Sequence, residues 1–205
     1  MDKIEFTENF KKCILKTLQF EGGYSNDPDD PGAETVFGIS RKYHPDWIGW
    51  DVIDNIEDKS SIDLSYLKSN NDLFYVVSKF YFEDFYRSSK ADKIEEFSPE
   101  LACNVFDFAV NAGVKTSDKT LQSAINLAIK MYGIETDEDY LVVDGLPGSK
   151  TFAVLKSVIE LCGEYKIIEA FKTERALYYT KLPQKNERLC KYVYGWVKRA
   201  LTFSV

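Results

Sequence analysis

The chain has 205 residues, of which 44% are hydrophobic and 29% charged, so it can bury a core and is not a disordered tail. Its net charge of −7 disfavours nucleic acid as a ligand, because an acidic surface repels phosphates. The four cysteines form no CxxC pair and the single histidine cannot complete a zinc site, so we expect neither a metal nor an organic cofactor.

The chain carries no visible targeting or spanning segment. Its first residues lack the basic and apolar regions of a secretory signal, and no run of about 18 apolar residues could cross a membrane. We therefore expect a protein that is made in the cytoplasm and reaches any target outside the membrane after export or cell lysis. We also expect a monomer.

The first predicted helix runs from about residue 8 to residue 20. Phe10, Ile14 and Leu18 recur every four residues, which indicates one buried helix face. Two glycines, Gly22 and Gly23, then stop the helix, one residue beyond Glu21.

Residues 24–39 have a different character. Their first part is dense in Asn, Asp, Pro and Gly, the residues that form turns, and Thr35 to Ile39 are mainly β-branched or aromatic. The pattern predicts a short, irregular antiparallel sheet, which is the only strand signal in the chain.

From about residue 72 the pattern is helical almost throughout. Asp72 can cap one helix, and Ser98-Pro99-Glu100 is a strong start signal for another, which Gly113 ends. Further predicted helices cover residues 118–131, 150–162, 164–181 and 187–201. The polar segment 87–97 is the best candidate for a boundary, and we expect one lobe over residues 1–93 and a second over 94–205.

Glu21 is the candidate for acid chemistry. Cutting a glycosidic bond needs a carboxyl group that is still protonated near neutral pH and can give its proton to the leaving oxygen. The negative end of the helix dipole and the apolar neighbours of Glu21 favour the protonated form, which predicts a pH optimum on the acid side of neutral. The alternative is that Glu21 is a solvated residue at a helix end.

The surrounding motifs resemble those of the glycoside hydrolase family 108 muramidases. The resemblance rests on blocks that occur in the family's order: Glu21-Gly22-Gly23-Tyr24, Asp30-Pro31-Gly32, Thr35-Val36-Phe37-Gly38-Ile39-Ser40, and Phe106-Asp107-Phe108-Ala109-Val110-Asn111-Ala112-Gly113. Two later blocks, Asp144-Gly145-Leu146-Pro147-Gly148-Ser149-Lys150-Thr151 and Gly195-Trp196-Val197-Lys198-Arg199, resemble the predicted peptidoglycan-binding module that accompanies this family.

This resemblance implies a mainly α-helical, lysozyme-like fold with a small irregular sheet near residues 24–39, and it implies that Glu21 is the general acid. Asp30 is our candidate for the second catalytic group, because it lies nine residues after Glu21, the spacing of phage-type lysozymes. Asp27 and Asp29, in the same turn, compete with Asp30 for this role. Thr35 is a further catalytic candidate, although the loop lengths differ from those of the phage enzymes.

The chain departs from the family pattern at Ala33, which stands where a second glycine is usual after Asp-Pro-Gly. If that position needs a positive φ, alanine there costs about 1 kcal/mol.

Other residues are candidate sugar contacts. Tyr24 offers an aromatic ring beside the acid. Asp107 and Asn111 are four residues apart on one predicted helix and share a face, so they could line a sugar groove or satisfy buried backbone groups. For Asp144 and Thr151 we expect a structural role in a loop that orients two helices, with Ser149 as a possible cap, and for Trp196 a role as a core anchor.

These observations predict a peptidoglycan hydrolase of the lysozyme type, which cleaves the β-1,4 bond between N-acetylmuramic acid and N-acetylglucosamine. Its partner would be the glycan strands of bacterial peptidoglycan. Two alternatives stay open: a lytic transglycosylase, and a non-catalytic protein that binds the wall or promotes secretion. A prophage lysis enzyme, a wall-remodelling enzyme and a secreted bacteriolytic protein all fit the sequence.

Overall fold

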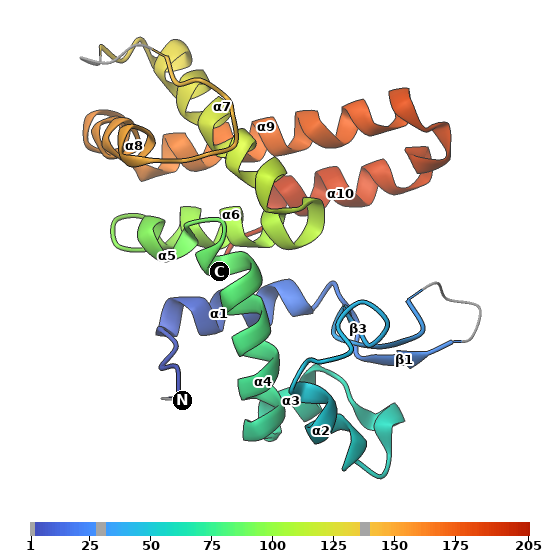
Figure 1. Ribbon diagram of the computed structural model, residues 1–205. Helices are drawn as coiled ribbons and strands as arrows, with labels where there is room; N and C mark the ends of the chain where they lie inside the picture. The colour runs from blue at the N-terminus through green and yellow to red at the C-terminus, as the bar shows by residue number, and fades with distance from the viewer. Residues whose placement is uncertain (1–2, 28–31, 136–139) are drawn as a thin grey trace. The chain divides into compact units, whose positions relative to one another are not determined.

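The computed structural model describes residues 3–27, 32–135 and 140–205 and divides into two compact units, Met1–Asp84 and Phe85–Val205. The predicted fold class is confirmed, because the described chain is mainly α-helical and contains one small antiparallel sheet (Figure 1). None of its described helices combines the length and apolar character that a membrane crossing requires.

The first unit consists of four helices and the sheet. The helices are α1 (Glu8–Leu18), α2 (Gly49–Asp54), α3 (Leu64–Ser69) and α4 (Asn71–Tyr81), with a 3-10 turn at Lys59–Ser61. A π-helical segment, Phe82–Arg87, continues from α4. The helices α2 and α3 are too short to leave a clear period in the sequence, and they were not predicted.

The predicted first helix is present, and it buries the predicted face. The Thr7 side chain accepts a hydrogen bond from the backbone N–H of Phe10, which caps the N-terminus of α1. Phe10, Ile14 and Leu18 are all buried, and α1 packs against α4. The rings of Phe6 and Phe10 also meet the ring of Phe82, with centroids 5.0–5.5 Å apart.

The helix α4 begins as predicted, but its cap differs from the predicted one. The side chain of Asn70, and not that of Asp72, accepts the hydrogen bond from the backbone N–H of Leu73. Asp72 lies in the first turn of the helix instead, where its negative charge interacts favourably with the positive end of the helix dipole.

The predicted sheet has three short strands in the order β1 (Tyr24–Asn26), β2 (Glu34–Val36) and β3 (Ile39–Ser40). Both pairs are antiparallel, and Val36 is the partner of Tyr24 on one side and of Ile39 on the other. Val36 and Ile39 are fully buried, so one face of the sheet belongs to the core of this unit.

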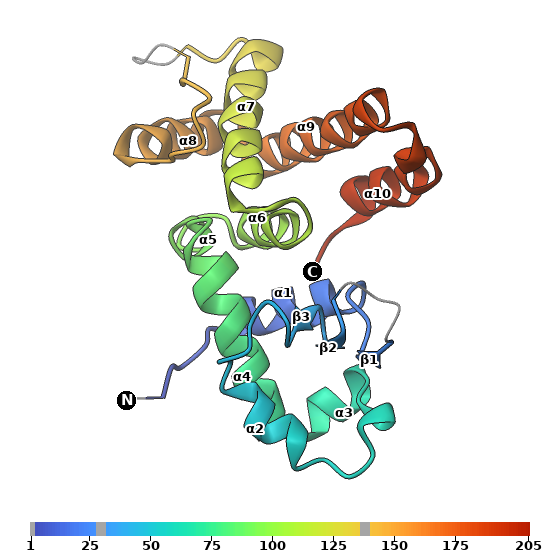
Figure 2. The ribbon, with the colours of Figure 1, turned by 45° about the vertical axis from the view of Figure 1, so that its right-hand side comes forward.

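The described secondary structure of the second unit is entirely helical. Its helices are α5 (Ala91–Ile94), α6 (Pro99–Ala112), α7 (Val114–Tyr132), α8 (Ser149–Cys162), α9 (Glu164–Lys185) and α10 (Cys190–Thr202), with a 3-10 turn at Glu187–Leu189. The long helix α9 packs against α6, α7, α8 and α10, and it crosses α7 (Figure 2).

The start and the end of α6 agree with the sequence. Pro99 occupies its first turn, and Gly113 ends it with φ = +88°. Ser98 stands at the cap position, but its hydroxyl donates to Glu164 at the start of α9 (2.7 Å) rather than capping α6. The start of α8 also differs from expectation, because Gly148 is the cap residue and Ser149 is the first helical residue.

Candidate active site

Glu21 lies three residues beyond the end of α1. The chain continues to turn after Leu18, with the N–H of Phe20 donating to the carbonyl of Thr17 and the N–H of Glu21 donating to the carbonyl of Leu18 (3.3 Å). The side chain of Glu21 is half-buried. A carboxyl group in this position is partly shielded from water and is still accessible from one side.

The two glycines after Glu21 meet different requirements. Gly22 has φ = +74°, a backbone conformation that favours glycine. Gly23 needs space, because a Cβ atom on it would lie 2.1 Å from the carbonyl oxygen of Ile62. That same oxygen accepts the N–H of Tyr24, so the close approach positions the start of β1 directly after the acid.

A two-residue turn connects β2 and β3 and lies beside Glu21. Phe37 and Gly38 have φ = +46° and +80°, as in a type I′ turn, which fits the twist of a tight hairpin. The N–H of Phe37 donates to the carbonyl of Gly23 (2.9 Å), and the buried hydroxyl of Tyr81 donates to the carbonyl of Phe37 (2.5 Å). The turn is therefore attached both to the segment after Glu21 and to the end of α4.

The carboxylate of Glu21 lies beside this turn. A Cβ atom placed on Gly38 would lie 3.4 Å from Oε2 of Glu21 and 3.0 Å from the hydroxyl oxygen of Tyr81. Gly38 itself is exposed. The absence of a side chain at this position leaves space above the carboxyl group, where the oxygen of a leaving group could accept its proton.

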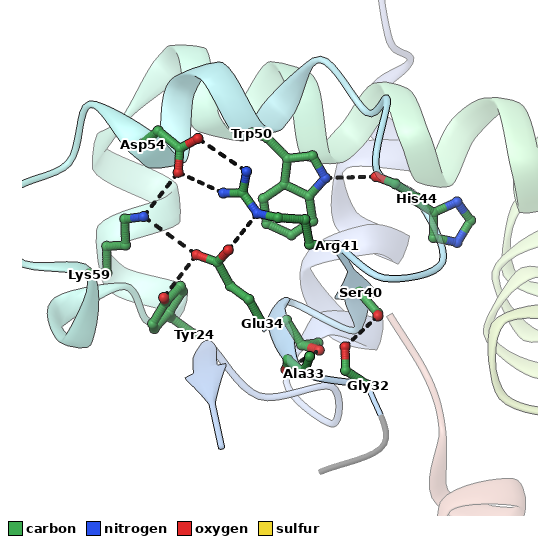
Figure 3. A network of polar contacts seen from close by, with 11 residues as sticks. Tyr24, Gly32, Ala33, Glu34, Ser40, Arg41, His44, Trp50, Asp54 and Lys59 are labelled. Carbon is green, nitrogen blue, oxygen red and sulfur yellow. Dashed lines mark hydrogen bonds and ion pairs between the residues drawn. The ribbon is translucent and has the colours of Figure 1, made fainter. Parts of the chain in front are cut away.

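A network of ion pairs surrounds Glu34 on β2 (Figure 3). The Glu34 carboxylate accepts a hydrogen bond from the hydroxyl of Tyr24 (2.9 Å) and pairs with Arg41 and with Lys59 (3.4 Å). Both cations also reach Asp54 on α2, with Arg41 bound through two nitrogens at 2.6 and 3.1 Å and Lys59 at 3.0 Å. The network thus fixes the sheet to α2.

This network keeps its acids ionised. Burial favours the protonated form of Glu34, but hydrogen bonds from Tyr24 and Arg41 and the charges of Arg41 and Lys59 lower its pKa below the usual range. Hydrogen bonds from Arg41 and Lys59 lower the pKa of Asp54 to about 2. Neither of these two carboxyl groups is therefore suited to donate a proton near neutral pH.

Three of the candidate residues lie in the sheet or next to it in sequence: Tyr24 in β1, Thr35 in β2, and Asp27 directly after β1. Tyr24 follows Glu21 by three residues, and its hydroxyl is bound to Glu34. Thr35 is half-buried on β2, and its hydroxyl donates to the carbonyl of Ala33 (3.2 Å). Asp27 is exposed. The preferred second carboxylate, Asp30, and its competitor Asp29 lie outside the described residues.

Asp107 and Asn111 lie in the second unit, and their surroundings differ. Asp107 is fully buried, and its carboxylate binds Arg175 at 2.6 Å and Arg199 at 2.6 and 3.1 Å. Of the two roles that the sequence left open, these contacts favour the structural one for Asp107. Asn111 is exposed, and its side-chain oxygen accepts a hydrogen bond from Tyr179 (2.5 Å).

The network of Glu34, Arg41, Asp54 and Lys59 was not predicted from the sequence. One signal was available, because a two-residue turn at Phe37-Gly38 places Glu34 directly opposite Arg41 across the hairpin. Indeed, the N–H of Arg41 donates to the carbonyl of Glu34 (2.8 Å). Nothing in the sequence pattern indicated that Asp54 and Lys59 would join this pair.

Two protein families match successive parts of the chain. Residues 14–113 match the family described as Glycosyl hydrolase 108, and residues 113–201 match the family described as Predicted Peptidoglycan domain. The first match contains Glu21, the sheet and the Glu34 network. No curated protein sequence matches the chain.

A solved structure from Brucella abortus, described as the structure of SagA, resembles the whole chain. It shares 21% sequence identity with a TM-score of 0.51, and the match covers 95% of each chain. At this identity the likeness extends to the fold alone.

Proposed function

We propose that this chain is an N-acetylmuramidase with Glu21 as its general acid, because residues 14–113 match the family described as Glycosyl hydrolase 108 and residues 113–201 match a predicted peptidoglycan domain. The enzyme would hydrolyse the β-1,4 bond between N-acetylmuramic acid and N-acetylglucosamine in peptidoglycan. It would take the glycan strand as its partner and use neither metal nor cofactor.

The observation that carries this proposal is the position of the Glu21 carboxylate beside the turn at Gly38. The acid is half-buried, and its neighbour in the turn has no side chain and is exposed. The Tyr81 hydroxyl holds the same turn through the carbonyl of Phe37. Such a rigid setting keeps the acid in a fixed position toward a bound sugar, which general acid catalysis requires.

For the second catalytic group we propose Asp30, which would stabilise the developing cation or activate water. The proposal rests on its spacing from Glu21 and on the family resemblance, and Thr35 would assist from β2. Glu34 is also ionised, but we do not propose it for this second role, because its carboxylate already binds Tyr24, Arg41 and Lys59.

We further propose a division of labour along the chain. Residues 1–93 would carry out the cleavage, and residues 94–205 would bind the wall. Along the sequence, the boundary between the two compact units falls between Asp84 and Phe85, and the boundary between the two family matches falls at residue 113.

The proposal is tested by digesting purified peptidoglycan with the full chain and identifying the products by mass spectrometry. We expect muropeptides with reducing ends from the wild type. The Glu21→Gln variant should be about 10²- to 10⁴-fold slower, because it cannot donate the proton. Glu5→Gln is a matched control, since Glu5 is exposed and lies in the same unit, and it should keep the wild-type rate.

Three outcomes would contradict parts of this assignment. Full activity of Glu21→Gln would remove Glu21 from its role. Products with 1,6-anhydro ends would identify a lytic transglycosylase, which uses one acid and no water. A wild-type protein that binds the wall and releases no products would be a non-catalytic binder.

The second group is tested separately by three single changes in the same turn, Asp27→Asn, Asp29→Asn and Asp30→Asn. We expect only Asp30→Asn to reduce the rate strongly. A near-wild-type rate for Asp30→Asn, with a loss in one of the other two variants, would transfer the role to that residue.

A further inference from the structure

A basic pocket is lined by residues of α7 and of the C-terminal part of α9. These two helices cross in the second unit (Figure 2). Its volume is about 450 Å³. Three lysines line it: Lys115 and Lys119 from α7, and Lys185 from the end of α9. Hydroxyl groups lie between them, and no acidic residue belongs to the described lining.

The three lysines have no acidic partner. Within residues 3–27, 32–135 and 140–205, no carboxylate lies within 4 Å of any of their ammonium groups. The nearest acid in sequence, Asp118, is only 5% exposed, and the charge that acts on it is that of Lys90. Lys119 acts on Asp144 through its charge alone, without a direct contact.

The hydroxyl groups of the pocket are also available. In the part of the chain that the structure describes, Thr116, Thr120 and Tyr178 make no side-chain hydrogen bond. Hydroxyl donors beside ammonium groups form a suitable environment for an anionic oxygen, because such a group accepts several charge-assisted hydrogen bonds.

The loop after α7 fixes the stems of two of these lysines. Gly145 approaches them so closely that a Cβ atom on it would lie 3.1 Å from Cγ of Lys115 and 3.1 Å from Cγ of Lys119. Their aliphatic stems are therefore packed against the loop, which reduces the freedom that their ammonium groups lose on binding a ligand. This packing distinguishes the pocket from a chance group of surface lysines.

We propose that this pocket binds a carboxylate of the peptidoglycan stem peptide. The assignment rests on the proposed function, which makes the wall the substrate, and it adds the part of the wall that is recognised. A pocket of this size holds a peptide of a few residues, and its cations and hydroxyl groups match a carboxylate better than a neutral sugar ring. It also supplies local attraction to an anionic wall in a chain whose net charge is −7.

The test measures binding of the full chain to sacculi from which teichoic acids have been removed, by co-sedimentation at low salt. All variants are made in the Glu21→Gln background, so that no wall is digested. The triple variant Lys115→Gln, Lys119→Gln, Lys185→Gln should bind about tenfold more weakly. The control triple Lys130→Gln, Lys191→Gln, Lys198→Gln makes the same change in charge at exposed positions of the same unit and should bind within about twofold of the parent.

A second variant leaves every charge in place. Gly145→Ala should displace the stems of Lys115 and Lys119 and weaken binding, whereas Gly133→Ala, also at a positive φ but with open space around it, should not. Removal of the stem peptides from the sacculi by an amidase should lower binding of the parent to the level of the Lys115, Lys119, Lys185 triple. The released peptides should compete with intact sacculi.

Equal binding of the parent and the Lys115, Lys119, Lys185 triple would overturn the assignment, and so would undiminished binding to sacculi without stem peptides. Competition by a teichoic acid and not by the released peptides would reassign the pocket to phosphate. Since all of these assays measure binding, they remain decisive even if the chain cuts no glycosidic bond, and the two proposals can fail independently.

Discussion

The Glu21 carboxylate lies beside the turn at Gly38, where an added Cβ atom would lie 3.4 Å from Oε2, an ordinary van der Waals contact. Gly38→Ala should therefore fill the space next to the acid and press on the Tyr81 hydroxyl oxygen, which would lie 3.0 Å from the new Cβ atom. Its φ of +80° adds strain of about 1 kcal/mol for alanine. We expect a loss of up to about 10²-fold in the rate of wall digestion, because the methyl group occupies the space beside the acid and catalysis is sensitive to displacements of the substrate of about 1 Å.

The matched control for that change is Gly133→Ala, which has φ = +60° and nothing within 4 Å of its added Cβ atom. Both variants should melt at a slightly lower temperature, but only Gly38→Ala should lose activity. A Gly38→Ala enzyme with the wild-type rate would mean that the position of Glu21 against the turn is unimportant for catalysis.

Ala33→Gly should stabilise the protein. Ala33 has φ = +52°, as expected if the usual glycine at this position is needed for a positive φ. Replacing alanine should remove about 1 kcal/mol of strain and raise the melting temperature by roughly 2–4 °C. Ala153→Gly makes the same chemical change in the exposed middle of α8 and should lower the melting temperature instead. A fall in the melting temperature for both variants would show that Ala33 is not strained.

Asp118 should make stability fall as the pH rises. Burial raises its pKa to about 7, although the charge of Lys90 acts in the other direction. Because the folded pKa is above the unfolded value of 3.8, the folded state holds a proton that the unfolded chain releases between pH 4 and 7. Stability is therefore complete below about pH 4, declines up to about pH 7, and stays low above it.

Asp118→Asn should remove this decline. Urea titrations at several pH values should show the variant close to wild type at pH 4 and more stable at pH 8, by up to about 4 kcal/mol if no other group adjusts. Asp46→Asn, a change at an exposed aspartate, should leave the pH profile as it is. An unchanged profile for Asp118→Asn would mean that this carboxyl group ionises in the folded state without difficulty.

The buried cluster of Asp107, Arg175 and Arg199 predicts an order of stability losses. It holds one acid and two cations, so Asp107→Ala leaves two buried positive charges and should cost about 3–5 kcal/mol. Arg199→Met leaves one balanced pair and should cost less. Chemical denaturation measures both losses. If Asp107→Ala folded with normal stability and failed to bind glycan, a sugar-contacting role would be correct after all.

Sequence patterns succeeded where a feature depends on neighbouring residues. The spacing of Phe10, Ile14 and Leu18 predicted the buried face of α1, and Ser98-Pro99 predicted the start of α6. The turn formers and β-branched residues of segment 24–39 predicted the sheet. Each of these signals lies within a few residues of the structure that it specifies.

The patterns failed where tertiary packing decides. Asp72 and Ser149 are plausible caps by residue type, but Asn70 and Gly148 occupy the cap positions, since the helices begin one or two residues away from the expected place. Asp107 shares a helix face with Asn111, and only the approach of α9 and α10 brings two arginines to it. The partners of Glu34 come from α2 and from the 3-10 turn, which no local period announces.

The shortness of the connection between β2 and β3 limits how this protein can be altered. The turn consists of Phe37 and Gly38 alone and cannot accommodate an extra residue. One inserted residue would shift the pairing of Val36 with Ile39 and move both side chains out of the core. It would also break the hydrogen bond that the turn accepts from Tyr81. The length of this turn should therefore vary little among relatives, and engineered tags belong at the chain ends rather than in this hairpin.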